Sequence, residues 1–268
     1  MKASAPASSA NLGAGFDALA LALDLMCEVE VEAGDSWDIA GDPDGFVRAA
    51  AERFSPHPLR IRVASDIPLG KGLGSSAAVL AALGTAITRL QGGPDDRGRV
   101  FDAVAAIEGH PDNAAAAVYG GLVLAHGGGI HRLEVHPSLS VIVAVPDVSL
   151  PTGEARRVLP SEVPFGAAVR TSARAMCLIE GLRTGDTDLL SAIGRDELHE
   201  PYRVSLRPVI GRLLEAASRA GSPFTAISGA GPAVLAVVTD ATGPAVADAL
   251  GEIVGRVFSP SIAVEGVR

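Results

Sequence analysis

One stretch in the first third of the chain constrains the fold more than any other. Residues 68–78, Pro-Leu-Gly-Lys-Gly-Leu-Gly-Ser-Ser-Ala-Ala, join a strand-like run to a helical pattern. Gly70, Gly72 and Gly74 lack a Cβ, so the backbone can adopt positive φ and approach a ligand closely. A helix that begins at the two serines would present unpaired N–H groups and partial positive charge to an anion. The stretch predicts a phosphate-binding loop without the Walker sequence, or alternatively a glycine-rich turn that only caps a helix.

Hydrophobic periodicity gives a coarse map of the remaining chain. Residues 5–17 are interpreted as a loop of small residues between a short opening strand and the apolar run 18–25. Apolar residues at spacings of three to four predict helices, and alternating or continuous apolar runs predict strands. The predicted helices cover 45–54, 75–90, 95–108, 165–182, 189–198, 209–220 and 244–254, and the predicted strands cover 29–31, 59–63, 121–125, 130–135, 139–145, 225–228, 233–239 and 257–264.

The composition changes near residues 146–151, where prolines flank a short polar stretch. We expect this point to separate an N-terminal domain, 1–148, from a C-terminal domain, 149–268. The strands up to residue 145 are expected to complete a first sheet. The helices and strands that follow predict an α+β layer in the second half.

Composition and charge exclude several classes of function. The chain has 268 residues, 48% of them hydrophobic, which is enough for a substantial core. A formal net charge of −9 provides no electrostatic footprint for nucleic acid or an anionic membrane, so we expect neither partner. Cys27 and Cys177 are the only cysteines and no signal peptide precedes them, which predicts a reducing cytoplasmic location. The apolar run 18–23 is too short to span a bilayer.

Two polar residues stand out in the small-residue segment near the start. Asn11 and Asp17 lie among alanines, serines and glycines. An amide and a carboxylate together suit the recognition of an ammonium or a hydroxyl group. The alternative interpretation is an Asx-turn and a helix N-cap.

A second polar cluster follows the helix predicted at 95–108. Glu108, His110, Asp112 and Asn113 lie within six residues, next to a glycine and a proline. Two carboxylates and an imidazole at this spacing could hold Mg²⁺ and orient a reacting hydroxyl. A solvated surface turn with a helix-capping aspartate is the alternative.

Arginines mark two further segments in the second half. Arg156 and its neighbour Arg157 lie in a segment flanked by prolines, and Arg203 ends the sequence Leu-His-Glu-Pro-Tyr-Arg. The planar guanidinium binds two oxygens at once, which suits a substrate carboxylate or phosphate. Exposed helix arginines without a function are the alternative, because most arginines lie on protein surfaces.

Taken together, these segments resemble the GHMP small-molecule kinases. Three motifs of that superfamily occur in the expected order, at 6–17, 68–78 and 228–232. Within the superfamily, the whole first motif and the segments 108–113, 152–160 and 198–203 are similar to the homoserine kinase family. The resemblance covers nearly the full chain, which is somewhat compact for that family.

The resemblance implies an α+β fold, the GHMP kinase fold, with an N-terminal half like ribosomal protein S5 domain 2 and a ferredoxin-like C-terminal half. It also implies transfer of the ATP γ-phosphoryl group to the side-chain hydroxyl of L-homoserine, with Mg²⁺, as a step in threonine biosynthesis. A homodimer is a further implication. The active site is expected between the two halves.

The family roles can be carried over to matching positions of this sequence. The phosphates would be held by Pro68, Gly70, Lys71, Gly72, Leu73, Gly74, Ser75, Ser76 and Ala77, and the substrate by Asn11, Asp17, Arg156, Arg203 and Gly229. The reacting end would be lined by His110, Asp112 and Asn113, and the metal would be held by Ser76 and Glu108, with Asp102 as the alternative acid.

The sequence leaves some choices open. Asp112 could act as a general base, or Asn113 could simply orient the hydroxyl. Lys71 could add a cation near the phosphates or could be an ordinary solvated loop lysine. The competing functions are a GHMP kinase for a different small alcohol and a nucleotide-binding regulator that has lost catalysis.

Overall fold

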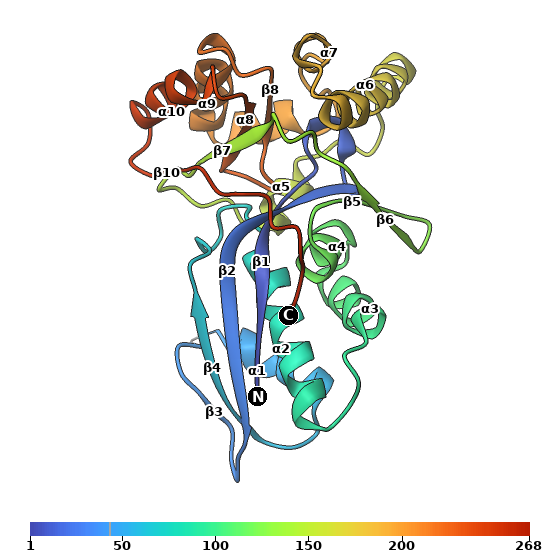
Figure 1. The fold of residues 1–268 in the computed structure, drawn as a ribbon, viewed down its shortest axis with the longest axis vertical. Helices are drawn as coiled ribbons and strands as arrows, with labels where there is room; N and C mark the ends of the chain where they lie inside the picture. The colour runs from blue at the N-terminus through green and yellow to red at the C-terminus, as the bar shows by residue number, and fades with distance from the viewer. Residues whose placement is uncertain (43) are drawn as a thin grey trace.

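The computed structural model describes residues 1–42 and 44–268 and contains two sheets, each covered by helices (Figure 1). In the first sheet the strand order is β3-β4-β2-β5-β6, and β1 pairs with β2. Its strands are β1 (Lys2–Ala10), β2 (Leu19–Ala33), β3 (Asp38–Ile39), β4 (Leu59–Ser65), β5 (Leu122–His126) and β6 (Gly129–Leu133). The helices on it are α1 (Phe46–Phe54), α2 (Ser75–Leu90), α3 (Arg97–Glu108) and α4 (Asp112–Tyr119).

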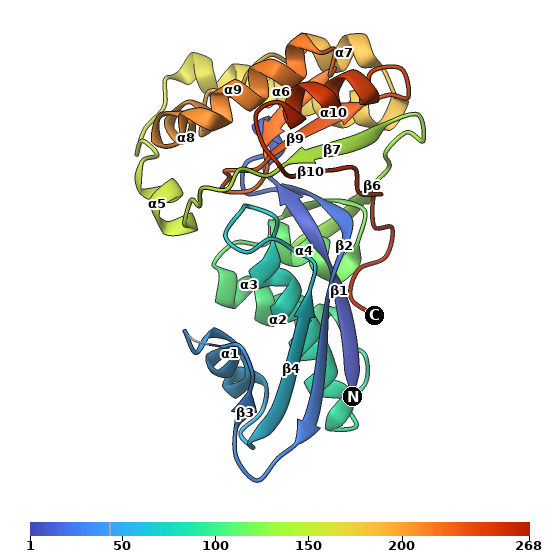
Figure 2. The same ribbon diagram turned by 90° about the vertical axis from the view of Figure 1, so that its left-hand side faces the viewer.

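The second sheet has the order β10-β7-β9-β8 and lies at the other end of the molecule. Its strands are β7 (Ser140–Ala144), β8 (Phe224–Ile227), β9 (Val234–Val238) and β10 (Val257–Phe258). The helices of this half are α5 (Thr152–Arg157), α6 (Phe165–Thr184), α7 (Thr187–Ala192), α8 (Glu200–Leu206), α9 (Pro208–Arg219) and α10 (Gly243–Gly251). Figure 2 shows α5 between the two halves, away from the other helices of the second half. The α+β class expected from the sequence is confirmed.

The small-residue segment at the start is a strand for half of its length, so the prediction of a loop over 5–10 is wrong. Strand β1 pairs antiparallel with β2, from Lys2 opposite Glu30 to Ala10 opposite Ala20. Alanine and serine have low strand propensity, but pairing along β2 overrides it. Their small side chains are buried because α2 packs directly against β1 and β2.

Helix α2 is the central element of the first core and spans the residues predicted for it, 75–90. It is rich in alanine, and nearly all of its residues from Ser75 to Ile87 are buried. Such a helix can lie close to a sheet because its side chains are short. The contact of α2 with β1 and β2 fixes the position of its first turn. This turn follows the glycine loop and faces the second half of the chain.

The bounds of the other helices differ from the predicted bounds to varying degrees. The helices predicted at 45–54 and 95–108 are present as α1 and α3, although α3 begins at Arg97 and is capped by Asp96, which accepts a hydrogen bond from the Arg99 N–H. The helix predicted at 189–198 is wrong in extent, because α7 ends at Ala192. Pro201 does not break a helix but lies in the first turn of α8, where its missing N–H costs no hydrogen bond.

Strand β7 belongs to the second sheet, so the expectation that 139–145 completes the first sheet is wrong. Ile142 pairs with Ala236 of β9. An apolar run marks a strand but carries no information on its partner, which depends on the chain path over many residues. The division at residue 148 remains a prediction, and β7, which precedes it, pairs with strands of the second half.

The last residues of the chain return to the first half instead of forming the long strand predicted at 257–264. After the two residues of β10, Ile262 bridges to Leu23, and Ser4 exchanges backbone bonds with Arg268. Figure 1 shows this segment running beside β1 toward the N-terminus. Among the described residues, no helix combines the length and apolar character needed to span a membrane.

Candidate active site

A pocket lies between the two halves and collects almost every site residue predicted from the sequence. It is lined by Asn11, Asp17, Pro68, Gly70, Lys71, Gly72, Leu73, Gly74, Ser75, Ser76, Glu108, His110, Asp112, Asn113, Thr152, Arg156, Arg203, Gly229 and Ala230. Ala77 is the exception, because its side chain faces the core and is fully buried. Thr152 was missed by sequence reasoning, although it lies four residues before Arg156 on α5, a spacing that places both on one helix face.

The glycine loop has the conformation that its composition predicts. Gly70, Gly72 and Gly74 have φ of 66°, 80° and 63°. A Cβ on Gly72 would lie 2.1 Å from the carbonyl oxygen of Ser228. The Ser228 hydroxyl donates to the Gly72 carbonyl at 2.8 Å, and the Ser8 N–H donates to the Leu73 carbonyl at 3.0 Å. The three motifs noted in the sequence therefore meet at this loop.

The first turn of α2 opens onto the pocket. Its N-cap is Gly74, which has no side chain to cap the free N–H groups. The hydroxyl of Ser75 is buried and has no hydrogen-bond partner among the described residues. Unpaired donors at a helix N-terminus favour an anion there, so this end of the pocket fits a phosphate group.

Lys71 does not extend freely into solvent. Its Nζ donates to the carbonyl oxygens of Asp147 at 2.6 Å and Val148 at 2.7 Å. Both carbonyls belong to the segment that connects β7 to α5. The ammonium group therefore ties the glycine loop to the connection between the halves, while still contributing positive charge at the pocket.

A carboxylate lies beside the first turn of α2. The Ser76 hydroxyl donates to Oε1 of Glu108 at 2.5 Å. Glu108 is the last residue of α3, and Gly109 ends that helix with φ of 80°. The turn brings Glu108 next to Ser76, and Ser76 stands at the helix N-terminus that fits a phosphate. Two hard oxygen donors beside a phosphate site match the coordination that Mg²⁺ prefers.

Asp102, the alternative metal-binding acid, lies elsewhere. It is on α3, six residues before Glu108, and does not line the pocket. Burial raises the pKa of the Tyr119 hydroxyl, and the charge of Asp102 adds to that rise. Asp102 is thus near Tyr119 at the α3–α4 contact, and the geometry favours Glu108 as the acid at the phosphate end.

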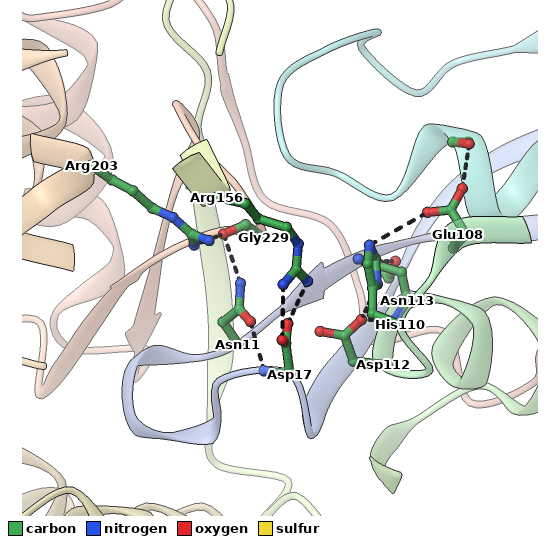
Figure 3. Close-up of polar contacts among 11 residues, drawn as sticks. Asn11, Asp17, Glu108, His110, Asp112, Asn113, Arg156, Arg203 and Gly229 are labelled. Atoms are coloured by element: carbon green, nitrogen blue, oxygen red, sulfur yellow. Dashed lines mark hydrogen bonds and ion pairs between the residues drawn. The ribbon is translucent and has the colours of Figure 1, made fainter. Parts of the chain in front are cut away.

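His110 connects the two carboxylates of the second cluster (Figure 3). Its Nδ1 lies 2.8 Å from Oδ1 of Asp112, and its Nε2 lies 3.9 Å from Oε2 of Glu108. The hydrogen bond to Asp112 is the main cause that raises the pKa of His110, while burial opposes it. The same Oδ1 accepts the Asn113 N–H at 2.7 Å, which holds the buried Asp112 in the first turn of α4.

Asn113 is held from the other side by the first strand. Its Oδ1 accepts a hydrogen bond from the Ser8 hydroxyl at 2.7 Å. Since Oδ1 is the acceptor, the amide NH₂ is the end of Asn113 that remains for a ligand in the pocket. Ser8 was not singled out by the sequence analysis, because a serine within a small-residue strand carries no distinguishing pattern.

Asp17 and Arg156 form a two-pronged ion pair at the opposite end of the pocket. Arg156 donates from Nη2 to Oδ1 at 2.7 Å and from Nη1 to Oδ2 at 3.0 Å. The bond to Asp17 is the main cause that raises the pKa of Arg156. Both side chains are about one third exposed, so a solute can reach them.

Arg203 and Asn11 share one acceptor. Nη1 of Arg203 and Nδ2 of Asn11 each donate to the Gly229 carbonyl at 2.8 Å, as Figure 3 shows. Arg203 is 2% exposed, its Nε has no partner, and no carboxylate of the described residues forms an ion pair with it. Burial is the main cause that lowers its pKa to about 10, and the charge of Arg156 contributes. A buried guanidinium without a counter-ion favours an anion in the pocket.

Comparison with known proteins gives consistent matches. The family model described as GHMP kinases N terminal domain matches residues 44–121, and that described as GHMP kinases C terminal matches residues 178–255. The homoserine kinase of Moorella thermoacetica is 38% identical over 251 residues, which are 86% of this chain and 85% of that protein. The homoserine kinase of Thermus thermophilus is 38% identical over 247 residues, 87% of this chain and 85% of that protein.

Solved structures show the same fold. A homoserine kinase from Cytophaga hutchinsonii superposes with a TM-score of 0.88 at 27% identity, covering 100% of this chain and 96% of that one. A mevalonate kinase from Methanococcus jannaschii superposes with a TM-score of 0.73 at 13% identity, covering 98% of both chains, which is a likeness of fold alone. The fold expected from the sequence motifs is therefore confirmed.

Proposed function

This chain belongs to the homoserine kinase family of the GHMP kinases, and we propose that it transfers the γ-phosphoryl group of ATP to the side-chain hydroxyl of L-homoserine. In that reaction a bond forms between the hydroxyl oxygen and the γ-phosphorus. The bond between the γ-phosphorus and the bridging oxygen breaks, so that this oxygen leaves with ADP, and the hydroxyl proton passes to a base or to solvent. The products are O-phospho-L-homoserine and ADP, in a step of threonine biosynthesis.

The observation that carries this proposal is the buried, unpaired Arg203 in the same pocket as the first turn of α2. One end of the pocket offers the Arg203 cation, which forms no ion pair with another described residue. The other end offers helix N–H groups and the Ser75 hydroxyl, which has no hydrogen-bond partner in the described part of the chain. Homoserine has a carboxylate for the first end and a hydroxyl that can point to the second. Asp17 adds an anion for the substrate ammonium, and Arg156 a second cation for the carboxylate.

Phosphoryl transfer requires positioning and charge stabilisation more than covalent participation of the protein. We assign the ATP phosphates to the glycine loop, where the backbone of Gly72, Gly74 and the two serines can approach them. Asn11 and Gly229 support the substrate end, because Asn11 accepts the Asp17 N–H and the Gly229 carbonyl accepts from Arg203. Lys71 supplies a nearby cation that is already fixed by two carbonyls.

The residues beside the phosphate end fit a magnesium ion. Ser76 and Glu108 are adjacent oxygen donors, and Mg²⁺ is commonly held by one or two such groups together with phosphates and water. When bound there, the ion supplies charge neutralisation of the phosphate oxygens. The protein's contribution is to hold the carboxylate at the helix terminus.

At the reacting end we assign Asp112, Asn113 and His110. Asp112 is buried and hydrogen-bonded to both of the others, so its orientation is fixed. The amide NH₂ of Asn113 can hold the acceptor hydroxyl, and the carboxylate of Asp112 is the available proton acceptor. The hydrogen bond to Asp112 raises the pKa of His110, which favours the protonated imidazole beside this carboxylate.

The two competing functions make different predictions in one experiment. ADP release is measured over a panel of small alcohols that includes homoserine, serine, threonine and mevalonate. Turnover with homoserine well above the others supports the proposal, whereas turnover with another alcohol and background activity with homoserine would reject it. ATP binding without ADP release on any alcohol indicates the regulator that has lost catalysis.

Other expectations accompany this proposal. A role in amino-acid biosynthesis supports a cytoplasmic location, and the family supports a homodimer. We also propose that residues 1–148 and 149–268 act as an ATP-binding and a ferredoxin-like domain around the shared pocket.

A further inference from the structure

A buried histidine lies directly behind Arg203. His199 precedes α8 and is fully buried, and Arg203 follows it by one helical turn. Nη1 of Arg203 lies 3.1 Å from Nδ1 of His199, and Nε2 of His199 lies 3.0 Å from the carbonyl oxygen of Gly13. The imidazole therefore joins the guanidinium to the loop that carries Asp17.

The partners of His199 determine its protonation. A guanidinium only donates hydrogen bonds, so Nδ1 must be the acceptor, and a carbonyl only accepts, so Nε2 must carry the proton. A second proton on Nδ1 would be directed at the positive charge of Arg203. Burial is the main cause that lowers the pKa of His199, to about 4. The charge of Asp196, whose Oδ2 lies 3.7 Å from Nε2, opposes this shift, and the charge of Arg203 adds to it. The ring is thus held neutral, in one tautomer.

The backbone of His199 is also fixed. Oδ2 of the buried Asp196 accepts the N–H groups of Leu198 at 3.0 Å, His199 at 2.7 Å and Glu200 at 3.0 Å. These bonds hold the first turn of α8. The imidazole is therefore attached to a rigid support, which is a requirement for a residue that orients another.

Phe16 connects the same histidine to both arginines. Its ring stacks on that of His199, with centroids 5.0 Å apart. The guanidinium carbons of Arg203 and Arg156 lie 5.4 Å and 5.8 Å from the centroid of Phe16. Both cations are within cation–π range of the ring, so Phe16 contacts His199 and both guanidinium groups.

We propose that His199 is a positioning residue for substrate recognition, which accepts a hydrogen bond from Arg203 and so aims the remaining N–H groups of Arg203 at the substrate carboxylate. This inference rests on the proposed function, because the carboxylate is that of homoserine. His199 does not line the pocket, so it acts through Arg203.

Two substitutions separate the two hydrogen bonds of the imidazole. In His199→Asn, the amide oxygen lies near the former Nδ1 and can still accept from Arg203. In His199→Gln, the amide nitrogen lies near the former Nε2 and can still donate to Gly13, but the acceptor for Arg203 is lost. We expect His199→Gln to raise the homoserine KM about tenfold, the effect of one charged hydrogen bond, with the ATP KM unchanged within about twofold. In His199→Asn, the homoserine KM and the ATP KM should both stay within about threefold of the wild-type values.

A core variant in the same half controls for loss of stability. Val246→Ala removes two methyl groups from a fully buried position on α10, a helix that contributes no residue to the pocket, and it should lower Tm without changing the ratio of the two KM values. An unchanged homoserine KM in His199→Gln, or a parallel rise of the ATP KM, would overturn the inference.

A second measurement does not depend on the reaction. Nitrogen-15 NMR of the histidine rings should show His199 as the neutral Nε2–H tautomer, and Arg203→Ala should shift its Nδ1 resonance. A protonated His199 ring would contradict the hydrogen bond from Arg203 to Nδ1. An Nδ1 resonance that is unchanged in Arg203→Ala would contradict it as well. If the wild-type protein is inactive on homoserine, the proposed function fails. The NMR measurement still tests the hydrogen bond between Arg203 and His199 in that case.

Discussion

Arg156 closes onto Asp17 across the substrate end of the pocket, with two hydrogen bonds of 2.7 Å and 3.0 Å between residues 139 positions apart in sequence. The pair brings together the two charges that a zwitterionic amino acid would need. A substrate ammonium can replace the guanidinium at Asp17, and a substrate carboxylate can replace Asp17 at the guanidinium. The two charges of the ion pair are therefore complementary to the two charges of the proposed substrate.

Replacing Arg156 should separate substrate binding from ATP binding. We expect Arg156→Ala to raise the homoserine KM about tenfold to a hundredfold, because a charged two-pronged contact is lost, and to leave the ATP KM nearly unchanged. Steady-state kinetics with each substrate varied would measure this. The neighbouring Arg157, whose one hydrogen-bond acceptor among the described residues is the Gly153 carbonyl on its own helix, provides the control Arg157→Ala. Equal effects of the two variants would remove Arg156 from the site.

The glycine loop should tolerate no side chain at Gly72. An added Cβ would meet the Ser228 carbonyl oxygen at 2.1 Å, where φ is 80°. Gly92 has a similar φ of 72° but no atom within 4 Å of its Cβ position. Gly92→Ala should cost about 1–2 kcal/mol from the left-handed backbone alone, and Gly72→Ala about 1–3 kcal/mol more from the clash. Urea unfolding would compare them, and equal losses would contradict the close contact between the loop and Ser228.

The metal requirement should depend on Glu108. We expect Glu108→Gln to raise the Mg²⁺ concentration for half-maximal activity about tenfold or more, because the charged ligand is lost while an amide still fits beside Ser76. Asp102→Asn removes the same charge on the same helix outside the pocket and should change little. Titration of ADP release with Mg²⁺ provides the measurement. A larger effect at Asp102 than at Glu108 would transfer the metal site to the other acid.

Glu200 should make stability depend on pH in the direction opposite to a salt-bridged carboxylate. Burial raises its pKa to about 7 from 4.5, although its Oε1 accepts the Ile227 N–H at 2.7 Å. The folded state therefore favours the protonated form, and the associated stability is full below pH 4.5 and lost as the pH rises through 7. Glu200→Gln keeps an acceptor oxygen without the charge. We expect it to be about as stable as the wild type near pH 4.5 and about 3 kcal/mol more stable at pH 8.

The control for this prediction is Glu215→Gln. Glu215 is 67% exposed and its ion pair with Arg219 is on the surface, so its loss should change the free energy of unfolding by no more than about 1 kcal/mol at either pH. Denaturant unfolding at several pH values gives the curve. The quantity compared is the free energy of unfolding of the wild type minus that of Glu200→Gln. If this difference is the same at pH 4.5 and pH 8, Glu200 ionises without a cost in stability and the prediction is wrong.

Sequence patterns located most of the pocket because its chemistry lies in short segments. The glycine loop, the cluster of Glu108, His110, Asp112 and Asn113, and Arg156 of α5 each carry a local pattern, and each contributes to the lining of the pocket. The patterns did not reveal that Ser8 holds Asn113, because these residues are 105 positions apart in the chain. His199 and Arg203 are only one helical turn apart, but their contact depends on the burial of both side chains, which no local pattern specifies. Ala77 was included from the motif, yet helix geometry turns its side chain into the core.

By itself, the sequence determined the local elements of this protein: the start of α2 after three glycines, the turn at Gly109 and the periodic faces of the long helices. Backbone sterics and the spacing of apolar residues act within a few residues, so they can be seen in the chain. Only the tertiary structure decided that residues 5–10 form a strand and that β7 joins the second sheet. It also decided that Arg203 is buried while Arg156 remains partly exposed to solvent. Those outcomes depend on pairing and burial between distant segments, which no local pattern specifies.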